Sequence, residues 1–350
     1  MRRARSVIVA LATVAASAVV PVSAQTLTYA LFERYLESYR EQYEIPGVSV
    51  AIIQRGALVW EAGLGKQDVD ANINPSADTP YYIGTLSQIF GSTLLLRKCL
   101  DQDTLELSDR ITRWVPYPDA EATVRQLLSH QTASGAYAYD PIRFSGLTRV
   151  IEQCADLSYR HVLAGEVFDR LSMTRSVPGR QLEGMAQPGR ATFPADRLAH
   201  YNSVIGQMAR SYRLDRGRPV RTSVPAAAAD AATGAITTVR DLWRFDNALR
   251  DHLLLTPSTL TGAWTQTKGP SSPLPTGLGW FVQNYNGEPV VWQFDLTRDA
   301  ASSMVVKLPN RDITFIILAN SDGVAAPFGL AAGDATASPF VRLFLRFFAV

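Results

Sequence analysis

The spacing of apolar positions predicts a helix and then two strands near the start of the chain. Residues 31–45 place apolar side chains on one face at helical intervals, and a Pro-Gly pair ends the pattern. The apolar runs 47–54 and 57–65 follow, separated only by an Arg-Gly pair, which indicates a hairpin turn. The first part of the chain therefore contributes two neighbouring strands to a sheet.

The rest of the chain is predicted to be helical first and then rich in strands. Residues 80–235 read as helical segments and long irregular stretches with little strand. Thr238 begins a new helix as its N-cap, and a buried apolar stripe follows it. The four strands and the terminal amphipathic helix that come next are 277–283, 288–294, 302–309, 312–320 and 338–350. This order predicts an α/β (α+β) fold, in which the N- and C-terminal segments form one antiparallel sheet, flanked by helices, around a mainly helical insertion.

The first 24 residues have the layout of a secretory signal peptide. Three arginines, an apolar run over 7–20 and small residues up to Ala24 predict export and cleavage after Ala24. The apolar run is too short for a membrane span, so we expect no transmembrane segment after cleavage and a periplasmic or secreted location. Loss of residues 1–24 lowers the formal net charge from +2 to −1, because this segment carries three arginines and no acidic residue. Nothing in that balance favours a nucleic acid partner.

The remaining residues, 25–350, are expected to form a single domain, because neither a repeat nor a linker interrupts them. The sheet region is predicted over 25–79 and 235–350. The helical region is predicted over 80–234.

Charged residues and possible metal ligands change this picture little. The arginines between positions 210 and 221 lack interleaved aromatic residues beyond one tyrosine, which favours a solvated loop. The four histidines are scattered without ligand spacing, so we predict no metal and no cofactor. Cys99 and Cys154 are compatible with a disulfide in an oxidising compartment and equally with two buried thiols, and the sequence leaves both possibilities open.

Candidate chemistry begins at the segment TPYYIGTLSQIF, residues 79–90. Thr85 and Gln88 are three residues apart, so both lie on one side of the first turn of the helix predicted after Gly84. Two polar side chains that enter the interior together need partners. The simplest interpretation is an N-cap threonine followed by a glutamine that faces the helix.

The order of several segments resembles that of the serine β-lactamase and penicillin-binding protein superfamily. The segments that carry the resemblance are IPGVSVAIIQRGALVWEAGLG, TPYYIGTLSQIF, LELSDRITRWVP, TVRQLLSHQTASG, AATGAITTVRDLWRF and FIILANSDG. They are most similar to the branch that holds class C β-lactamases, D-Ala-D-Ala carboxypeptidases and related esterases. The resemblance spans nearly the whole chain after the signal segment and implies a β-lactamase/transpeptidase-like fold.

Such proteins work through three sequence boxes, and this chain departs from each. Ser-x-x-Lys supplies the nucleophile and the group that handles its proton, but here Thr85 and Gln88 occupy those positions. Tyr-x-Asn corresponds to YDP, which keeps Tyr139 but ends in Pro141. Lys-Thr-Gly or His-x-Gly corresponds to QFD, which begins at Gln293 and ends at Asp295.

The resemblance therefore implies a catalytic unit that has been lost or changed. Gln88 has no ionisable nitrogen and cannot take the proton of Thr85. Pro141 lacks the side-chain amide of asparagine. Asp295 places a carboxylate where the family has glycine, which would repel a substrate carboxylate. Tyr139 is expected to stay protonated at neutral pH, because its pKa is about 10 without a nearby ammonium.

Three hypotheses follow from these substitutions. The first is an exported, non-catalytic relative that keeps its cleft for peptidoglycan-type peptides, another small ligand or a partner. The second is a weak or altered hydrolase, of esterase, peptidase or β-lactamase type, that uses the Thr85 hydroxyl with Tyr139 or Asp295 as base. The third is an exported structural protein without a small-molecule role.

Overall fold

A six-stranded antiparallel sheet joins the two ends of the chain, in the strand order β2-β1-β10-β9-β8-β7. The computed structural model describes residues 24–182 and 192–349, so the predicted signal segment lies almost wholly outside the described residues. The strands are β1 Gly47–Gln54, β2 Ala57–Gly65, β7 Phe281–Tyr285, β8 Glu288–Thr297, β9 Ala301–Leu308 and β10 Ile313–Ala319. Because β1 pairs directly with β10, the predicted antiparallel sheet built from both ends of the chain is confirmed.

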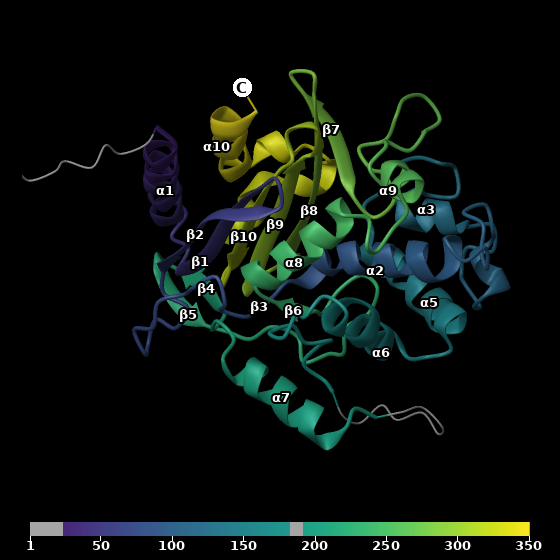
Figure 1. Cartoon of the computed structure of the whole chain (residues 1–350), viewed down its shortest axis with the longest axis horizontal. Helices are drawn as coiled ribbons and strands as arrows, with labels where there is room; N and C mark the ends of the chain where they lie inside the picture. Colours follow the sequence, from purple (N-terminus) through teal and green to yellow (C-terminus); the bar gives the residue numbers. More distant parts are fainter. Residues whose placement is uncertain (1–23, 183–191, 350) are drawn as a thin grey trace, which may run out of the picture.

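Helices cover both faces of this sheet (Figure 1). Helices α1 (Ala24–Gln42) and α10 (Pro339–Phe348) pack on one face, where Val50 and Ile52 of β1 point. Helices α2 (Gln88–Leu95) and α8 (Val239–Arg250) belong to the core on the other face. Alternate residues of a strand point to opposite faces, so burial on both sides explains why β1 and β10 read as continuous apolar runs.

Shorter elements make up the region between these strands. They are β3 Tyr81–Tyr82, α3 Val124–Leu128, α4 Pro141–Ser145, α5 Leu147–Ala155, α6 Tyr159–Leu163, α7 Ala195–Gly206, β4 Tyr212–Asp215, β5 Arg218–Arg221, β6 Ile236–Thr237 and α9 Pro257–Ala263. Thr238 caps α8 as predicted, because its side chain accepts the backbone N–H of Asp241 at 3.0 Å. Within the described ranges, we find no helix both long and apolar enough to cross a membrane.

The arginine-rich segment is a hairpin of β4 and β5, so its interpretation as a loop was wrong. Its turn is an Arg-Gly pair in which Arg216 has φ 52° and Gly217 has φ 74°. The pair between β1 and β2 has the same signs, with φ 51° and 78°. Two consecutive positive φ angles match the twist of a tight hairpin. The second hairpin was missed because apolar runs flank only the first one.

Cys99 and Cys154 form a disulfide, with their Cα atoms 5.7 Å apart. Cys99 lies in a π-helical turn, Leu96–Leu100, that continues α2, and Cys154 lies on α5. The bond resolves the choice that the sequence left open between a disulfide and two thiols. The bond ties the continuation of α2, the helix that carries Gln88, to α5.

Candidate functional site

The helix that carries the first box begins as a 3₁₀ turn, Gly84–Ser87, and becomes α-helical only at Gln88. Thr85 does not cap it, so the N-cap interpretation was wrong. Its hydroxyl donates instead to the carbonyl of Phe294 on β8, at 3.1 Å. Residues three apart eclipse each other on a 3₁₀ turn, so Thr85 and Gln88 still share one side, which faces the sheet.

Asp295 of β8 supplies the acceptor at this helix start. Its Oδ1 accepts the backbone N–H of Thr85 at 2.8 Å and lies 3.3 Å from the Thr85 hydroxyl. Its two oxygens also accept from the hydroxyl of Thr297, each at 3.1 Å. Asp295 is fully buried, and burial raises the pKa of its carboxyl to about 7, although these hydrogen bonds oppose the shift.

Sequence reasoning placed the Asp295 carboxylate where it would repel a substrate carboxylate. The structure instead encloses this carboxyl between β8 and the 3₁₀ turn, where burial disfavours its charged form and raises its pKa. Gly84 makes the enclosure possible, since a Cβ at this position would overlap both the Asp295 carboxyl and the Thr297 hydroxyl. The glycine in front of the first box and the aspartate in the third box are thus sterically matched.

Gln88 belongs to a buried, uncharged network that we name the Gln88 cluster, formed with His130 and Gln293. The Oε1 atom of Gln88 lies 3.0 Å from Nε2 of His130 and accepts from Nε2 of Gln293 at 3.1 Å. The backbone N–H of Asp140 donates to Nδ1 of His130, so the ring proton is on Nε2 and points to Gln88. Burial lowers the pKa of His130 to about 3, which keeps the ring neutral.

Tyr139 lies beside this network with its ring against Phe294 and His130, at centroid distances of 5.5 and 4.6 Å. Its hydroxyl is buried and makes no hydrogen bond of normal geometry within the described part of the chain, and the same holds for the Nε2 group of Gln88. Burial raises the pKa of Tyr139 well above its ordinary value, against smaller opposing effects of Thr85 and Gln88. The side chain is therefore a protonated donor at neutral pH.

The structure brings Thr85, Gln88, Tyr139, Gln293 and Asp295 together, and it places Pro141 one step away. Pro141 is the first residue of α4, whose N-cap is Asp140. Asp140 connects this box to the Gln88 cluster only through its N–H bond to His130. The roles assigned to these six positions remain predictions.

The hydroxyls of two neighbouring serines have partners outside the Gln88 cluster. The Oγ atom of Ser87 accepts the backbone N–H of Ala235 at 3.1 Å, on the side away from Thr85, as its helical position indicated. Ser134 contacts the hydroxyl of Thr132 in a surface turn, 2.9 Å away. Among the residues that the structure describes, no group of three or more His, Cys, Asp or Glu side chains could hold a metal ion.

Sequence reasoning missed His130 and Thr297. His130 lies within TVRQLLSHQTASG, a segment that carries the family resemblance, but neither residue belongs to the three boxes, and each becomes part of the site only through the fold. The available signal was general: a buried glutamine needs hydrogen-bond partners, and a buried carboxyl needs several. That rule predicts that partners exist but does not indicate which residues provide them. His130, for example, lies 42 positions from Gln88 in the sequence.

A model of the Beta-lactamase family matches residues 32–336 of this chain. The chain belongs to the β-lactamase family. The match includes every position of the three altered boxes and confirms the resemblance inferred from the sequence segments. The altered boxes therefore belong to a family member with the family's fold intact.

Three proteins that are similar to this chain share 17% to 23% sequence identity with it. Protein flp of Staphylococcus aureus (strain MW2) is 23% identical over 326 residues, which cover 83% of this chain and 63% of that protein. The chain thus spans less than two thirds of this relative's length. A penicillin-binding protein homologue from Pyrococcus abyssi has a TM-score of 0.70 at 19% identity, over 88% of this chain and 76% of that one. The D-amino acid amidase of Ochrobactrum anthropi SV3, in complex with D-phenylalanine, has a TM-score of 0.69 at 17% identity, over 91% and 98%. These structures show the shared fold.

Proposed function

We propose that this β-lactamase family protein is an exported binding protein that does not carry out serine acyl transfer. One observation carries the proposal: the carboxyl of Asp295 occupies the backbone N–H of Thr85, at 2.8 Å. Acyl transfer requires free donors where negative charge develops beside the nucleophile. At Thr85 the nearest such donor is its own backbone N–H, which is already hydrogen-bonded to the carboxyl of Asp295.

The handling of protons supports the same conclusion. The Oε1 atom of Gln88 already accepts from His130 and Gln293, and an amide is no base. Tyr139 is held in its protonated form by burial. Loss of a catalytic unit of this kind typically costs about 10⁴- to 10⁶-fold in rate. We therefore expect no useful turnover of β-lactams or of D-Ala-D-Ala peptides.

The ligand that we propose is a D-aminoacyl compound, such as the end of a peptidoglycan peptide. The names of two structural neighbours support this class, since one is a penicillin-binding protein homologue and the other a D-amino acid amidase in complex with D-phenylalanine. Thr85 is partly exposed, so a ligand can contact this residue beside β8. Export, which the proposal includes, rests on the predicted signal peptide. N-terminal sequencing of the envelope form tests it, because retained residues 1–24 would refute cleavage.

Two measurements on the purified chain test binding against catalysis. Intact mass after incubation with an acylating β-lactam or a fluorophosphonate should show no adduct. Thermal unfolding should shift upward with D-Ala-D-Ala peptides and not with L-Ala-L-Ala peptides. An adduct lost in Thr85→Ala would refute the non-acylating assignment. No shift with any cell-wall fragment would leave the structural role as the better account.

Restoration of the family boxes sharpens this test. The combination Thr85→Ser, Gln88→Lys, Pro141→Asn and Asp295→Gly should be needed for acylation. Gln88→Lys alone should restore little, because the Thr85 N–H stays occupied and the other boxes stay altered. Full activity in the single variant would contradict the proposal.

A second candidate function has its own observation. The Thr85 hydroxyl lies 3.3 Å from Oδ1 of Asp295, whose pKa of about 7 suits a general base. A slow hydrolase of this type would lose turnover of a simple ester in both Thr85→Ala and Asp295→Asn, and its rate would rise with pH through about 7. Ester turnover that is unchanged in Asp295→Asn would exclude this mechanism.

A further inference from the structure

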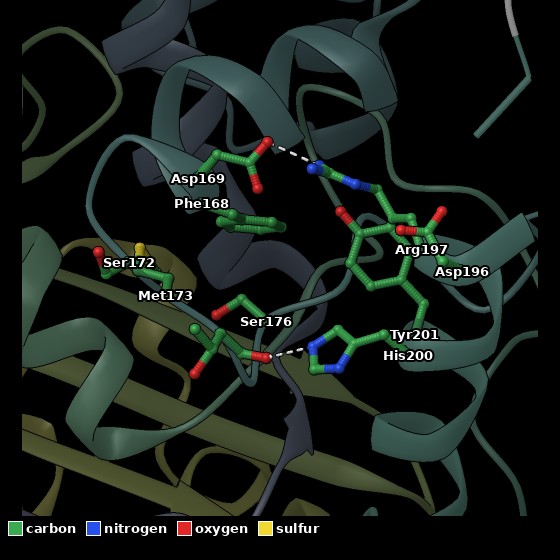
Figure 2. Close-up of a pocket in the computed structure, with 10 residues that line it drawn as sticks. Phe168, Asp169, Ser172, Met173, Ser176, Asp196, Arg197, His200 and Tyr201 are labelled. Atoms are coloured by element: carbon green, nitrogen blue, oxygen red, sulfur yellow. Dashed lines mark hydrogen bonds and ion pairs between the residues drawn. The ribbon is translucent and has the colours of Figure 1, made fainter. Parts of the chain in front are cut away.

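A cavity lies away from Thr85, between α7 and the segment 168–176 (Figure 2). Its volume is about 530 Å³, within the range of small-molecule pockets. The residues of the three family boxes do not line it. A ligand bound here would therefore be independent of the altered catalytic positions.

The floor of this cavity is apolar and well packed. Phe168, Met173 and Tyr201 are 2%, 1% and 4% exposed. The hydroxyl of Ser176, also at the floor, already donates to Oδ2 of Asp241 at 2.8 Å. The floor thus offers a flat, mainly aromatic surface on which an apolar side chain could rest.

Charged groups stand at one end of the cavity. Nη1 of Arg197 pairs with Oδ2 of Asp169 at 2.6 Å, and both side chains are partly exposed to solvent. At the other end, His200 bonds to the carbonyl of Thr174 through Nε2, at 2.7 Å. Figure 2 shows Arg197 beside Asp169 at one end, His200 at the other, and Phe168 and Tyr201 between them. Two bridges therefore hold α7 against the segment opposite while the space between stays open.

Hydrogen-bonding capacity remains unused beside the ion pair. The Tyr201 hydroxyl is buried and makes no hydrogen bond of normal geometry to the described residues; burial raises its pKa, and the nearby Arg197 opposes that shift. Arg197 has five N–H donors, and its bond to Asp169 uses one. Asp169 accepts that bond with one of its two oxygens, so the other remains available.

We propose that this cavity binds a free α-amino acid with an apolar side chain. The carboxylate would accept from the Arg197 guanidinium and the Tyr201 hydroxyl. The ammonium would donate to the free oxygen of Asp169, and the side chain would lie on Phe168 and Met173. An α-amino acid carries its two charged groups on the same carbon atom, so it can align antiparallel to the ion pair of Arg197 and Asp169.

This arrangement favours a zwitterion over a ligand with a single charge. A simple carboxylate would bring an uncompensated negative charge beside Asp169. A simple amine would bring an uncompensated positive charge beside Arg197. A zwitterion places each of its charges opposite a protein charge of the other sign, and it adds contacts to the apolar floor.

Calorimetric titration with L-phenylalanine, up to about 10 mM, tests the proposal. The comparison compounds are 2-phenylethylamine and 3-phenylpropanoate, each of which carries one of the two charges. We expect saturable binding of the amino acid and at least tenfold weaker binding of either analogue. Equal binding of all three compounds, or no heat of binding with the amino acid, would overturn the proposal.

Variants then locate the site. Arg197→Gln should weaken binding of L-phenylalanine at least tenfold, and Tyr201→Phe should weaken it about three- to tenfold without loss of fold. Arg110→Gln is the matched control, because Arg110 forms an ion pair with Glu121 on the exposed surface elsewhere. Thr85→Val should leave this binding unchanged. Binding lost in Thr85→Val and retained in Arg197→Gln would place the amino acid at the family site and refute the proposal that the cavity beside α7 binds it. This conclusion would not depend on the outcome of the D-Ala-D-Ala experiments.

Discussion

The Gln88 cluster lies on the same face of the sheet as a second buried polar group, which we name the Lys307 cluster and which contains Lys307, Asp246 and Thr314. Lys307 on β9 lies opposite Val291 on β8, and Val291 shares its face of the strand with Gln293, two residues further on. The side chains of Lys307 and Gln293 therefore both point to the helices α2 and α8. Lys307 and Asp246 are 4% and 7% exposed and form an ion pair, which the hydroxyl of Thr314 joins. One buried cluster has therefore kept full charges, and the other has none.

The two clusters differ in whether a buried charge has a partner of opposite charge. A buried lysine is stable only beside a partner that compensates for its lost hydration, and Asp246 does this for Lys307. At the first box, glutamine takes the place of the family's lysine, and its partners are a neutral imidazole and another amide. Buried amides need hydrogen bonds but no counter-charge. The surroundings of Gln88 thus resemble an ordinary polar core, and the charged cluster lies outside the three boxes.

The largest effect is expected from removal of one charge of the Lys307 cluster. Lys307→Met should lower the free energy of unfolding by about 3–5 kcal/mol, because Asp246 would stay buried without its partner. The double variant Lys307→Met/Asp246→Leu should recover much of this loss. Chemical denaturation measures both, with Arg110→Gln as an exposed control that costs less than about 1 kcal/mol. A loss below about 1 kcal/mol in the single variant would show that the two clusters do not differ as described.

The second prediction concerns pH and Asp295. Its folded-state pKa of about 7 lies above the ordinary value of 3.8, so its contribution to stability is fully present below pH 3.8. Between these values the unfolded state loses its proton first, and the free energy of unfolding falls by up to about 1.4 kcal/mol per pH unit. The contribution is lost once pH rises above about 7.

Asp295→Asn isolates this contribution, since asparagine keeps an acceptor for the Thr85 N–H without a titrating group. The difference between wild type and variant matters here, because His130, whose pKa is lowered to about 3, contributes an opposite slope at acidic pH. We expect the variant to gain stability relative to wild type as pH rises from 5 to 8. Parallel curves over this range would show that Asp295 is ionised in the folded protein.

The third prediction tests the steric match between Gly84 and Asp295. Gly84→Ala should cost about 1–3 kcal/mol, because its Cβ would overlap the Asp295 carboxyl and Thr297 hydroxyl at a backbone φ of +36°. In the Asp295→Gly background the cost of Gly84→Ala should fall by at least about 1 kcal/mol, as expected for residues in contact. Additive losses in denaturation experiments would show that the two positions are independent.

The sequence predicts the sheet well and the site only in part. Strands β1 and β2 match their predicted bounds: β1 is buried on both faces and reads as a continuous apolar run, and the Arg-Gly turn separates it from the partly buried edge strand β2. The spacing of Thr85 and Gln88 also predicts that both face one side. The partners of those side chains depend on strand register and on a loop, which sequence patterns do not specify. Asp295 shows this most clearly: the sequence suggests a charge that repels a substrate carboxylate, whereas the structure makes Asp295 a buried acceptor for the 3₁₀ turn.

The smallest effect is expected at Tyr139, the family residue that this chain keeps. Its hydroxyl is buried without a hydrogen bond of normal geometry to the described residues, while its ring packs on Phe294 and His130. An unsatisfied buried hydroxyl destabilises a protein, so Tyr139→Phe should leave the free energy of unfolding unchanged or raise it by about 1 kcal/mol. Tyr139→Leu is the control, since it removes the ring and should be clearly destabilising. If Tyr139→Phe instead lowers the free energy of unfolding by more than about 1 kcal/mol in denaturation experiments, the hydroxyl has a hydrogen-bond partner in the folded protein. The polar network around Gln88 would then include Tyr139 as well.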